Sequence, residues 1–327
     1  MRYLRDIYKH MIILSFNHYL SLASRLPCRS AMSRILDRRS LLSTIASVVV
    51  VITTTATAGC TSGSQKPAQA SESVYDRVIR SGVIRASYTN YAPYCLKDQN
   101  SGKLSGIFVE ALEEVGRRLA LRIDWTEEVG YGTIFEGLNS GRYDIFGAGV
   151  WKNATRGKVG DFSKPLMFNV IKLWGRPNEK RFTDLSALNA PDVRIATQDG
   201  AIEDVIAKSD YPKATRVSVP QLTPWSEVLL NITSKKADVT FAEPAAVNIY
   251  LEKNPGSLRE LAPTKPLRVF ANCYAFKLGE EKFKSMLDAA VDEIVNDGTV
   301  DRILRKYEHV PDEFYRVAKP YDVPPAK

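Results

Sequence analysis

Strand-like and helix-like segments alternate along most of this 327-residue chain, and this alternation constrains the fold more than any other feature. Short apolar runs bounded by turn residues predict strands, and apolar residues spaced three or four apart predict helices. The predicted strands are 83–87, 122–126, 144–148, 193–197, 217–219, 238–241 and 270–277. The predicted helices are 74–80, 109–119, 133–138, 226–233, 245–253, 283–294 and 300–307. Such alternation indicates an α/β fold with largely parallel sheets.

The first 59 residues differ from the remainder in charge. They hold eight Lys or Arg and two acidic residues, whereas the remainder holds 37 basic and 35 acidic residues. The net charge of +8 therefore comes mainly from the front of the chain and not from a basic binding face. This distribution argues against a nucleic-acid partner.

Residues 32–59 have the layout of an export signal. Arg38 and Arg39 are followed by a mildly apolar run from Leu41 to Ala58 and by small residues before Cys60. The paired arginines resemble a twin-arginine signal, and the sequence TAGC resembles a lipobox in which Cys60 is lipidated. A transmembrane anchor is the alternative for the apolar run. We expect the protein in the periplasm or at the outer face of the cell membrane, anchored to that membrane by a lipid.

The segments on either side of this signal have separate roles in our interpretation. Met32 opens a conventional signal sequence, so residues 1–31 are predicted to be an upstream extension. Residues 60–73 are small and polar and are predicted to form a flexible linker between the lipid and the folded domain.

Cysteine and histidine usage limits the chemistry of the folded part. Cys95 and Cys273 remain after the front end, and in an oxidising compartment they either form a disulfide or stay as two buried thiols. His309 is the one histidine beyond residue 59. A Ser-His or Cys-His catalytic pair and a multi-histidine metal site are therefore disfavoured, and we expect no metal and no cofactor.

The stretch from Tyr143 to Val170 carries the strongest candidate binding motif. Gly149 ends a short apolar strand and allows close approach of the backbone, and Asn153 can cap a helix whose first turn contains Arg156. Free backbone N–H groups and a guanidinium at one place suit a carboxylate. An ordinary strand-to-helix turn with a solvated arginine explains the same residues.

From Gly82 to about Tyr307 the chain resembles bacterial extracytoplasmic solute-binding proteins of the polar-amino-acid type, family 3. The segments that carry this resemblance are GVIRAS, YAPY, GKLSGIFVEAL, LNSGRYDIFGAG, VGDFSKP and NDGTVDRILRKYE, in this order. The resemblance implies a type-2 periplasmic binding fold, in which two α/β lobes are joined by two crossing strands with a ligand cleft between them. It divides the chain into lobe 1 (74–168 plus 267–310), lobe 2 (169–266) and a loosely attached tail (311–327).

The resemblance also implies roles for individual residues. Arg156 matches the arginine that binds the ligand carboxylate, and Glu243 matches the acid that binds its ammonium. Tyr91 and Tyr131 match the rings that pack on the ligand side chain. The turn at Gly200 and Ala201, with Asp199 as a helix cap, matches a second anion-binding site. Plain packing is the alternative for the two tyrosines. A solvated position before a proline is the alternative for Glu243, but its place at the carboxyl end of a strand, where ligands bind in open α/β sheets, favours the functional role.

Four places depart from the family pattern. Tyr88 replaces a frequent acid, and Trp151 and Gly149 replace frequent hydroxyl residues; Ala201-Ile202 replace a threonine pair. These changes predict a drier and more aromatic pocket, which suits an aromatic or apolar amino acid or a related amine-carboxylate. The indole of Trp151 could also contact a ligand amine through a cation–π interaction.

The expected function is that of a monomeric substrate-binding component of an ABC transporter. Closure of the lobes, with hinges at 168–171 and 264–269, would capture an amino acid or analogue and present it to the permease subunits. The alternative is a periplasmic enzyme on the same fold, similar to a cyclohexadienyl dehydratase, in which Glu243 acts as general acid or base.

Overall fold

The computed structural model describes residues 72–262, 267–310 and 313–318. The described residues all belong to one compact unit, which begins at residue 70. The predicted upstream extension, the export signal and Cys60 lie outside the described residues, as does nearly all of the linker. Within the described part of the chain, no helix has both the length and the apolar character needed to cross a membrane.

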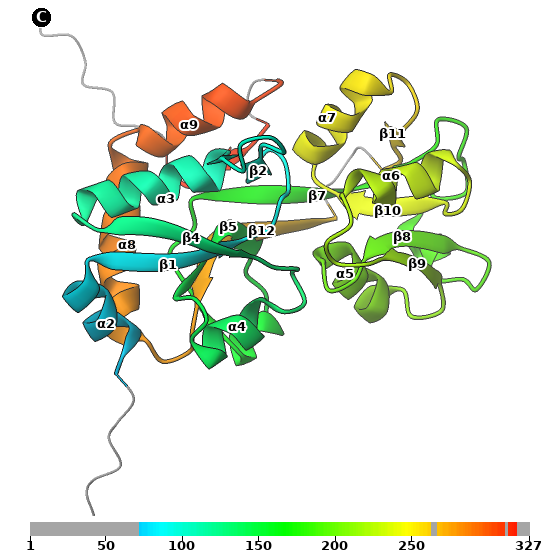
Figure 1. Cartoon of the computed structure of the whole chain (residues 1–327). Coiled ribbons are helices and arrows are strands. Elements are labelled where there is room, and N and C mark those ends of the chain that lie inside the picture. Colours follow the sequence, from blue (N-terminus) through cyan, green and yellow to red (C-terminus); the bar gives the residue numbers. More distant parts are fainter. Residues whose placement is uncertain (1–71, 263–266, 311–312, 319–327) are drawn as a thin grey trace, which may run out of the picture. The chain divides into compact units, whose positions relative to one another are not determined.

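Lobe 1 is built on a sheet in which β1 pairs in parallel with both β4 and β5. Its helices pack on this sheet through apolar faces, and α3 and α9 lie side by side in Figure 1. Its strands are β1 (Val83–Tyr88), β2 (Leu96–Lys97), β3 (Leu104–Ser105), β4 (Arg122–Glu128), β5 (Ile145–Trp151) and β6 (Asp161–Phe162). Its helices are α2 (Val74–Ser81), α3 (Ile107–Arg118), α4 (Ile134–Ser140), α8 (Glu281–Asn296) and α9 (Thr299–Tyr307).

Lobe 2 repeats the alternation of strand and helix on a second sheet. In that sheet β8 pairs in parallel with both β9 and β10, and α5 and α6 pack on them. Its strands are β8 (Arg194–Gln198), β9 (Thr215–Val219), β10 (Val239–Ala242) and the short β11 (Arg259–Glu260). Its helices are α5 (Ile202–Asp210), α6 (Ser226–Thr233), α7 (Pro244–Lys253) and the 3₁₀ turn Leu185–Leu188.

Two long antiparallel strands, β7 (Met167–Gly175) and β12 (Arg268–Phe276), run between the lobes (Figure 1). β12 pairs with β5 of lobe 1, whereas the far end of β7 pairs with β10 of lobe 2. This arrangement is the predicted pair of crossing strands. The predicted hinge 168–171 lies on β7; the second hinge falls partly outside the described residues, and hinge motion at both places stays a prediction.

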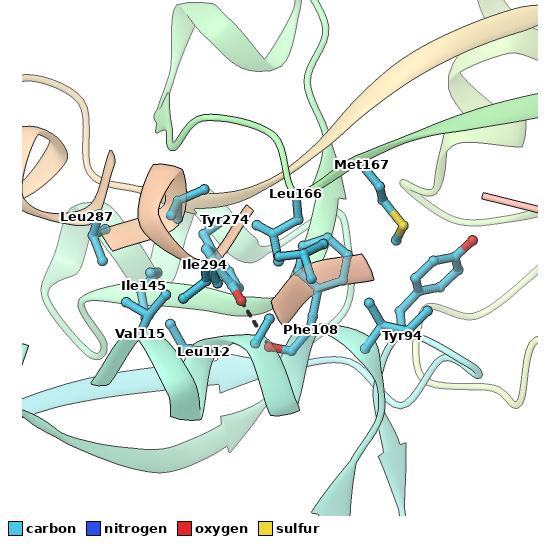
Figure 2. Packing of buried hydrophobic residues seen from close by; sticks show 14 of the residues in the cluster. Tyr94, Phe108, Leu112, Val115, Ile145, Leu166, Met167, Tyr274, Leu287 and Ile294 are labelled. Carbon is cyan, nitrogen blue, oxygen red and sulfur yellow. Dashed lines mark hydrogen bonds between the residues drawn. The ribbon is translucent and has the colours of Figure 1, made fainter. Parts of the chain in front are cut away.

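The core of lobe 1 explains why α3 forms where the sequence pattern places it. Phe108, Leu112 and Val115 project from one face of α3 toward residues of β5 and α8 (Figure 2). The hydroxyl of Tyr274 donates to the carbonyl of Phe108 at 3.0 Å, so this buried polar group is satisfied. Burial of such side chains contributes about 1.5–3 kcal/mol each.

A buried aspartate precedes the central strand of each lobe and holds that strand in place. Asp144 lies before β5 and accepts a hydrogen bond from the backbone N–H of Arg85 on β1, at 2.7 Å. Asp238 lies before β10 and accepts one from the backbone N–H of Arg194 on β8, at 3.0 Å. Each carboxylate also pairs with the arginine side chain. The aspartates therefore hold the starts of β5 and β10, and this fixes the position of both strands, whose opposite ends face the cleft.

Two predicted helix starts are wrong in detail. Arg156 opens a single 3₁₀ turn, Arg156–Lys158, and not a helix. Asn153 does act as a local cap, because its Oδ1 accepts the backbone N–H of Arg156 at 3.0 Å. Asp199 does not cap α5: its carboxylate accepts from the Ser218 hydroxyl, and Ala201 occupies the cap position.

The predicted loose tail is also wrong for residues 313–318. Phe314 is 2 % exposed and packs edge-on against Tyr94. Tyr315–Arg316 forms strand β13, which pairs with β7. Arg316 donates to Asp301 at 2.9 Å, so charge pairing as well as apolar burial holds this segment. The remaining tail residues lie outside the described part of the chain.

Cys95 and Cys273 are free, buried thiols in the structure. The disulfide that the sequence left open does not form there. Burial raises the pKa of both thiols to about 12, which keeps them protonated and unreactive at neutral pH. Both pack in one apolar cluster with Val150 and Phe162, so they behave as small core residues.

Candidate ligand-binding site

A small enclosed cavity lies between the lobes, where the carboxyl ends of their parallel strands meet. Its volume is about 20 Å³, close to the space that one water molecule needs. Its lining residues are Tyr91, Tyr94, Tyr131, Gly149, Trp151, Arg156, Gln198, Ala201, Ile202, Glu203, Trp225 and Asn272. An organic ligand therefore requires the lobes to separate or these side chains to move.

Arg156 is a buried cation at the wall that lobe 1 contributes. Its side chain donates to the carbonyl oxygens of Trp151 at 3.1 Å and Gly200 at 3.3 Å, and its guanidinium lies 5.9 Å from the ring centre of Tyr131. It forms no ion pair within the described part of the chain. Burial accordingly lowers the pKa of Arg156 to about 10. A buried guanidinium that lacks an acid partner is suited to an anionic ligand group.

Glu243 is a buried acid contributed by lobe 2, directly after β10 and before Pro244 at the start of α7. Its Oε1 accepts the hydroxyl proton of Tyr91 at 2.6 Å. Its Oε2 is buried and has no hydrogen-bond partner among the described residues. Burial raises the pKa of Glu243 to about 7. An unpartnered carboxylate oxygen of this kind can accept a proton or an ammonium.

Glu203, which the sequence analysis did not select, is a second buried acid beside the cavity. It lies in the first turn of α5 and accepts the backbone N–H of Gln198 at 3.1 Å and the indole N–H of Trp225 at 3.2 Å. Burial, together with the neighbouring Glu243, raises its pKa to about 7. An acid in the helix turn after the Gly200 turn was the available signal, but it is equally typical of a solvated helix start.

Aromatic rings form most of the cavity wall. Tyr91 stacks on Tyr94 with ring centres 5.6 Å apart and meets Tyr131 and Trp225 edge-on at 6.3 and 5.5 Å. Tyr91 and Tyr131 are thus brought together as predicted. Tyr94 and Trp225 also line the cavity, and the sequence analysis selected neither as a site residue. The predicted aromatic character of the pocket agrees with this wall.

Trp151 lines the cavity, and its indole also packs against other residues of the protein. Its indole stacks on Phe270 of β12 with ring centres 6.0 Å apart, and its N–H donates to Asn169 Oδ1 of β7 at 3.3 Å. The ring therefore rests against the two crossing strands. Contact between this indole and a ligand amine stays a prediction.

The two glycines of the predicted site, Gly149 and Gly200, lie where other parts of the protein come too close for a side chain. At Gly149, φ is +83° and a Cβ would lie 2.6 Å from the ring of Phe108, so no side chain fits there. At Gly200, φ is +75° and a Cβ would lie 2.6 Å from the Cα of Gly132 in the other lobe. The missing hydroxyl at position 149 thus reflects core packing as well as pocket polarity.

The predicted anion-binding turn at Gly200 and Ala201 is not formed. The amide of Gly200 donates to the Asp204 carboxylate at 3.2 Å, and that of Ala201 donates to the carbonyl of Gln198 at 3.0 Å. Gly200 instead offers its carbonyl to Arg156. Ala201 lines the cavity, but its own amide and that of Gly200 are already used within the chain.

Among the described residues, hydrogen bonds join the two walls of the cleft directly. They include Tyr91 to Glu243, Arg156 to the Gly200 carbonyl, and the Gly132 amide to Gln221 Oε1 at 3.0 Å. The first two use the groups that the sequence assigns to ligand binding. A ligand that bound both groups would take over contacts that otherwise hold the lobes together.

The model of the bacterial extracellular solute-binding proteins, family 3, matches residues 83–310. This span runs from the first residue of β1 to beyond the end of α9, and it covers well over half of the chain. The chain belongs to this family. The family predicted from the sequence is thereby confirmed. Because this is a family of extracellular solute-binding proteins, the predicted location outside the cytoplasm agrees with the match.

The relatives found by sequence comparison are distant in sequence. The L-cystine-binding protein TcyA of Bacillus subtilis (strain 168) is 23 % identical over 270 residues, which cover 80 % of this chain and 94 % of that protein. A cyclohexadienyl dehydratase of Pseudomonas aeruginosa (strain PAO1) is 23 % identical over 222 residues, which cover 67 % and 82 %. The relatives thus include a binding protein and an enzyme.

Solved structures confirm the type-2 periplasmic binding fold. An ancestral amino-acid-binding protein, a precursor of cyclohexadienyl dehydratase, superposes with a TM-score of 0.62 and 21 % identity, covering 72 % of this chain and 99 % of that one. A solute receptor for L-cysteine of Neisseria gonorrhoeae superposes with a TM-score of 0.64 and 17 % identity, covering 75 % and 99 %.

The two buried glutamates of this family 3 protein predict a stability that depends on pH. Their pKa values are raised from 4.5 to about 7, so their stabilising contribution is full below pH 4.5 and is lost as the pH rises through 7. We expect the melting temperature to fall by roughly 5–10 °C more between pH 5 and pH 8 in the wild type than in a Glu203→Gln, Glu243→Gln double variant. Scanning calorimetry at both pH values measures this difference, and equal falls would contradict it.

Proposed function

We propose that this protein is the substrate-binding component of an ABC transporter and that its ligand is an amino acid or a related amine-carboxylate. The observation that carries the proposal is a pair of buried groups on opposite lobes: the guanidinium of Arg156, which has no acid partner among the described residues, and the Oε2 of Glu243, which has no hydrogen-bond partner there. A zwitterion supplies one anion and one cation, so it satisfies both groups at once and holds the lobes closed.

The proposal extends to the carrier role and to the site of action. The TcyA relative is an L-cystine-binding protein, and the solute receptor of known structure is one for L-cysteine. Export by the 32–59 signal and lipidation of Cys60 would keep the protein beside the permease subunits that receive the ligand. We further propose that it acts as a monomer and has no catalytic function.

Binding of free amino acids is directly measurable by thermal shift. The purified protein is heated in the presence of each of the 20 L-amino acids. At least one should raise the melting temperature by roughly 5–10 °C when its concentration is about 100–1,000 times its Kd. No shift with any of the 20 amino acids, at concentrations up to about 10 mM, where a Kd of about 1 mM still gives a measurable shift, would overturn the amino-acid part of the proposal.

An enzymatic function is the second candidate, and one observation favours it. Glu203 and Glu243 both have pKa values near 7, which is the value that suits a general acid at neutral pH. The dehydratase relative is an enzyme with a sequence similar to this chain. Incubation of the protein with prephenate or arogenate and detection of a dehydrated product would favour this candidate over the carrier.

A further inference from the structure

The charges around the cavity do not balance for a simple zwitterion. Arg156 is the one basic residue among those lining the cavity in the described part of the chain. Against it stand Glu203, which lines the cavity and is 3 % exposed, and Glu243, which is 1 % exposed and contacts the lining residue Tyr91. A zwitterionic ligand adds no net charge, so one of the two carboxylates stays buried without compensation. Burial of an uncompensated charge is costly.

A chain of amide contacts aims one further acceptor at the cavity. The indole N–H of Trp151 can only donate, so the Asn169 side chain must present its oxygen to it. Asn272 therefore turns its Nδ2 to the same Asn169 oxygen, at 2.9 Å. This leaves Asn272 Oδ1 buried, at the cavity lining, and without a hydrogen-bond partner in the described residues.

The remaining wall is suited to a cation. Tyr91, Tyr131 and Trp225 present aromatic rings to the cavity, and ring faces attract a cation such as an ammonium or a guanidinium. Glu203 and Asn272 lie on the same lining and offer oxygen atoms. Beyond the carboxylate contact of Arg156, these groups therefore provide acceptors and π faces for the ligand side chain.

We propose that the ligand is an α-amino acid whose side chain carries a second, cationic nitrogen with N–H donors, and that Glu203 and Asn272 Oδ1 receive that side chain. The proposal rests on the proposed function, because it assigns the α-carboxylate to Arg156 and the α-ammonium to Glu243. A cationic amino acid brings the charge of the closed cleft to zero and gives Asn272 its missing donor. This replaces the apolar ligand that the sequence departures favoured.

The test compares cationic amino acids with neutral counterparts of similar length. Calorimetric titrations at pH 8 use L-arginine against L-citrulline and L-lysine against L-norleucine. We expect the cationic member of at least one pair to bind roughly 10- to 100-fold more tightly than its neutral counterpart. In Glu203→Gln, that preference should fall below about threefold. Glu227→Gln, at an exposed position on α6, is the matched control and should keep the wild-type preference.

A measurement on the wild type alone covers the case in which Glu203→Gln does not fold. Titrations in two buffers of different ionisation enthalpy report the protons taken up on binding. The charged and titratable groups facing Glu203 are Arg156, Glu243, Tyr91 and Tyr131. When a neutral amino acid binds, the protein should take up about one proton, which neutralises the spare carboxylate. When a cationic amino acid binds, the protein should take up close to none.

The outcomes separate this inference from the proposed function. Equal affinities within both pairs, with no change in Glu203→Gln and no proton uptake by any ligand, would overturn the cationic ligand while leaving amino-acid binding in place. Failure of every amino acid to bind would overturn both. Two results would support the inference. One is a preference for the cationic member that is lost in Glu203→Gln; the other is proton uptake by the protein when the neutral member binds but not when the cationic member binds.

Discussion

Replacing Arg156 by alanine is expected to abolish amino-acid binding while the protein remains folded. The guanidinium is the buried cation to which we assign the ligand carboxylate, and the neighbouring carbonyl groups are acceptors that cannot replace a charge-assisted contact to a carboxylate. We expect the affinity to fall by at least about 100-fold, equivalent to roughly 3 kcal/mol. Calorimetric titration with the amino acid that gives the largest thermal shift measures this loss.

The fold should tolerate the loss of Arg156 because its removal also removes a burial cost. No acid of the described residues is left unpaired by the change, and only two carbonyl groups lose a donor. Arg156→Lys keeps a charge without the planar fork and should recover only part of the affinity. Arg122→Ala, at an exposed site on β4, is the control and should bind normally. An Arg156→Ala protein that binds within threefold of the wild type would contradict the carboxylate role.

Replacing Glu243 by glutamine should have the second largest effect. The amide can still accept the Tyr91 hydroxyl proton, so the local packing is kept, but the charge that we propose as the partner of the ligand ammonium is lost. We expect amino-acid affinity to fall roughly 30-fold or more. Binding of the corresponding deaminated acid, which has no ammonium, should change little. Titration of the variant with both compounds gives the comparison.

The same variant distinguishes the carrier from the enzyme. If Glu243 is a general acid, Glu243→Gln should leave binding of prephenate or arogenate nearly intact while product formation stops. If Glu243 is instead the partner of the ligand ammonium, the affinity for the amino acid falls in Glu243→Gln, and neither the wild type nor the variant forms a product. Glu227→Gln is again a suitable control, because it makes the same chemical change at an exposed position. Unchanged amino-acid affinity in Glu243→Gln would contradict the ammonium role.

Much of the fold could be predicted because its signals are local. The helices α2 and α6 begin where the apolar spacing places them, and α6 matches the predicted range 226–233 in full. Helix starts were less predictable where tertiary contacts decide. Arg156 opens only a 3₁₀ turn because the chain leaves at once for β6, and Asp199 gives up its cap role to bond with Ser218.

The two charged residues assigned to the ligand were predictable, whereas the residues between them were not. Arg156 and Glu243 each follow the carboxyl end of a strand in its own lobe, and the topology of an α/β fold places ligands at such ends. Glu203 and Trp225 become cavity residues only through a contact between separate helices. Asn272 depends on a side chain of another strand, and no sequence pattern reports such an orientation. The tail residue Phe314 was missed for the same reason, since its partner Tyr94 is far away in the chain.

The most direct test of the central claim is a calorimetric comparison of one amino acid with its two single-charge analogues. The ligand found by thermal shift is titrated into the wild-type protein beside its decarboxylated amine and its deaminated acid. A cleft that holds a zwitterion between Arg156 and Glu243 should bind each analogue at least about 100-fold more weakly than the amino acid. Either analogue binding as tightly as the amino acid would contradict the claim that both charges are held.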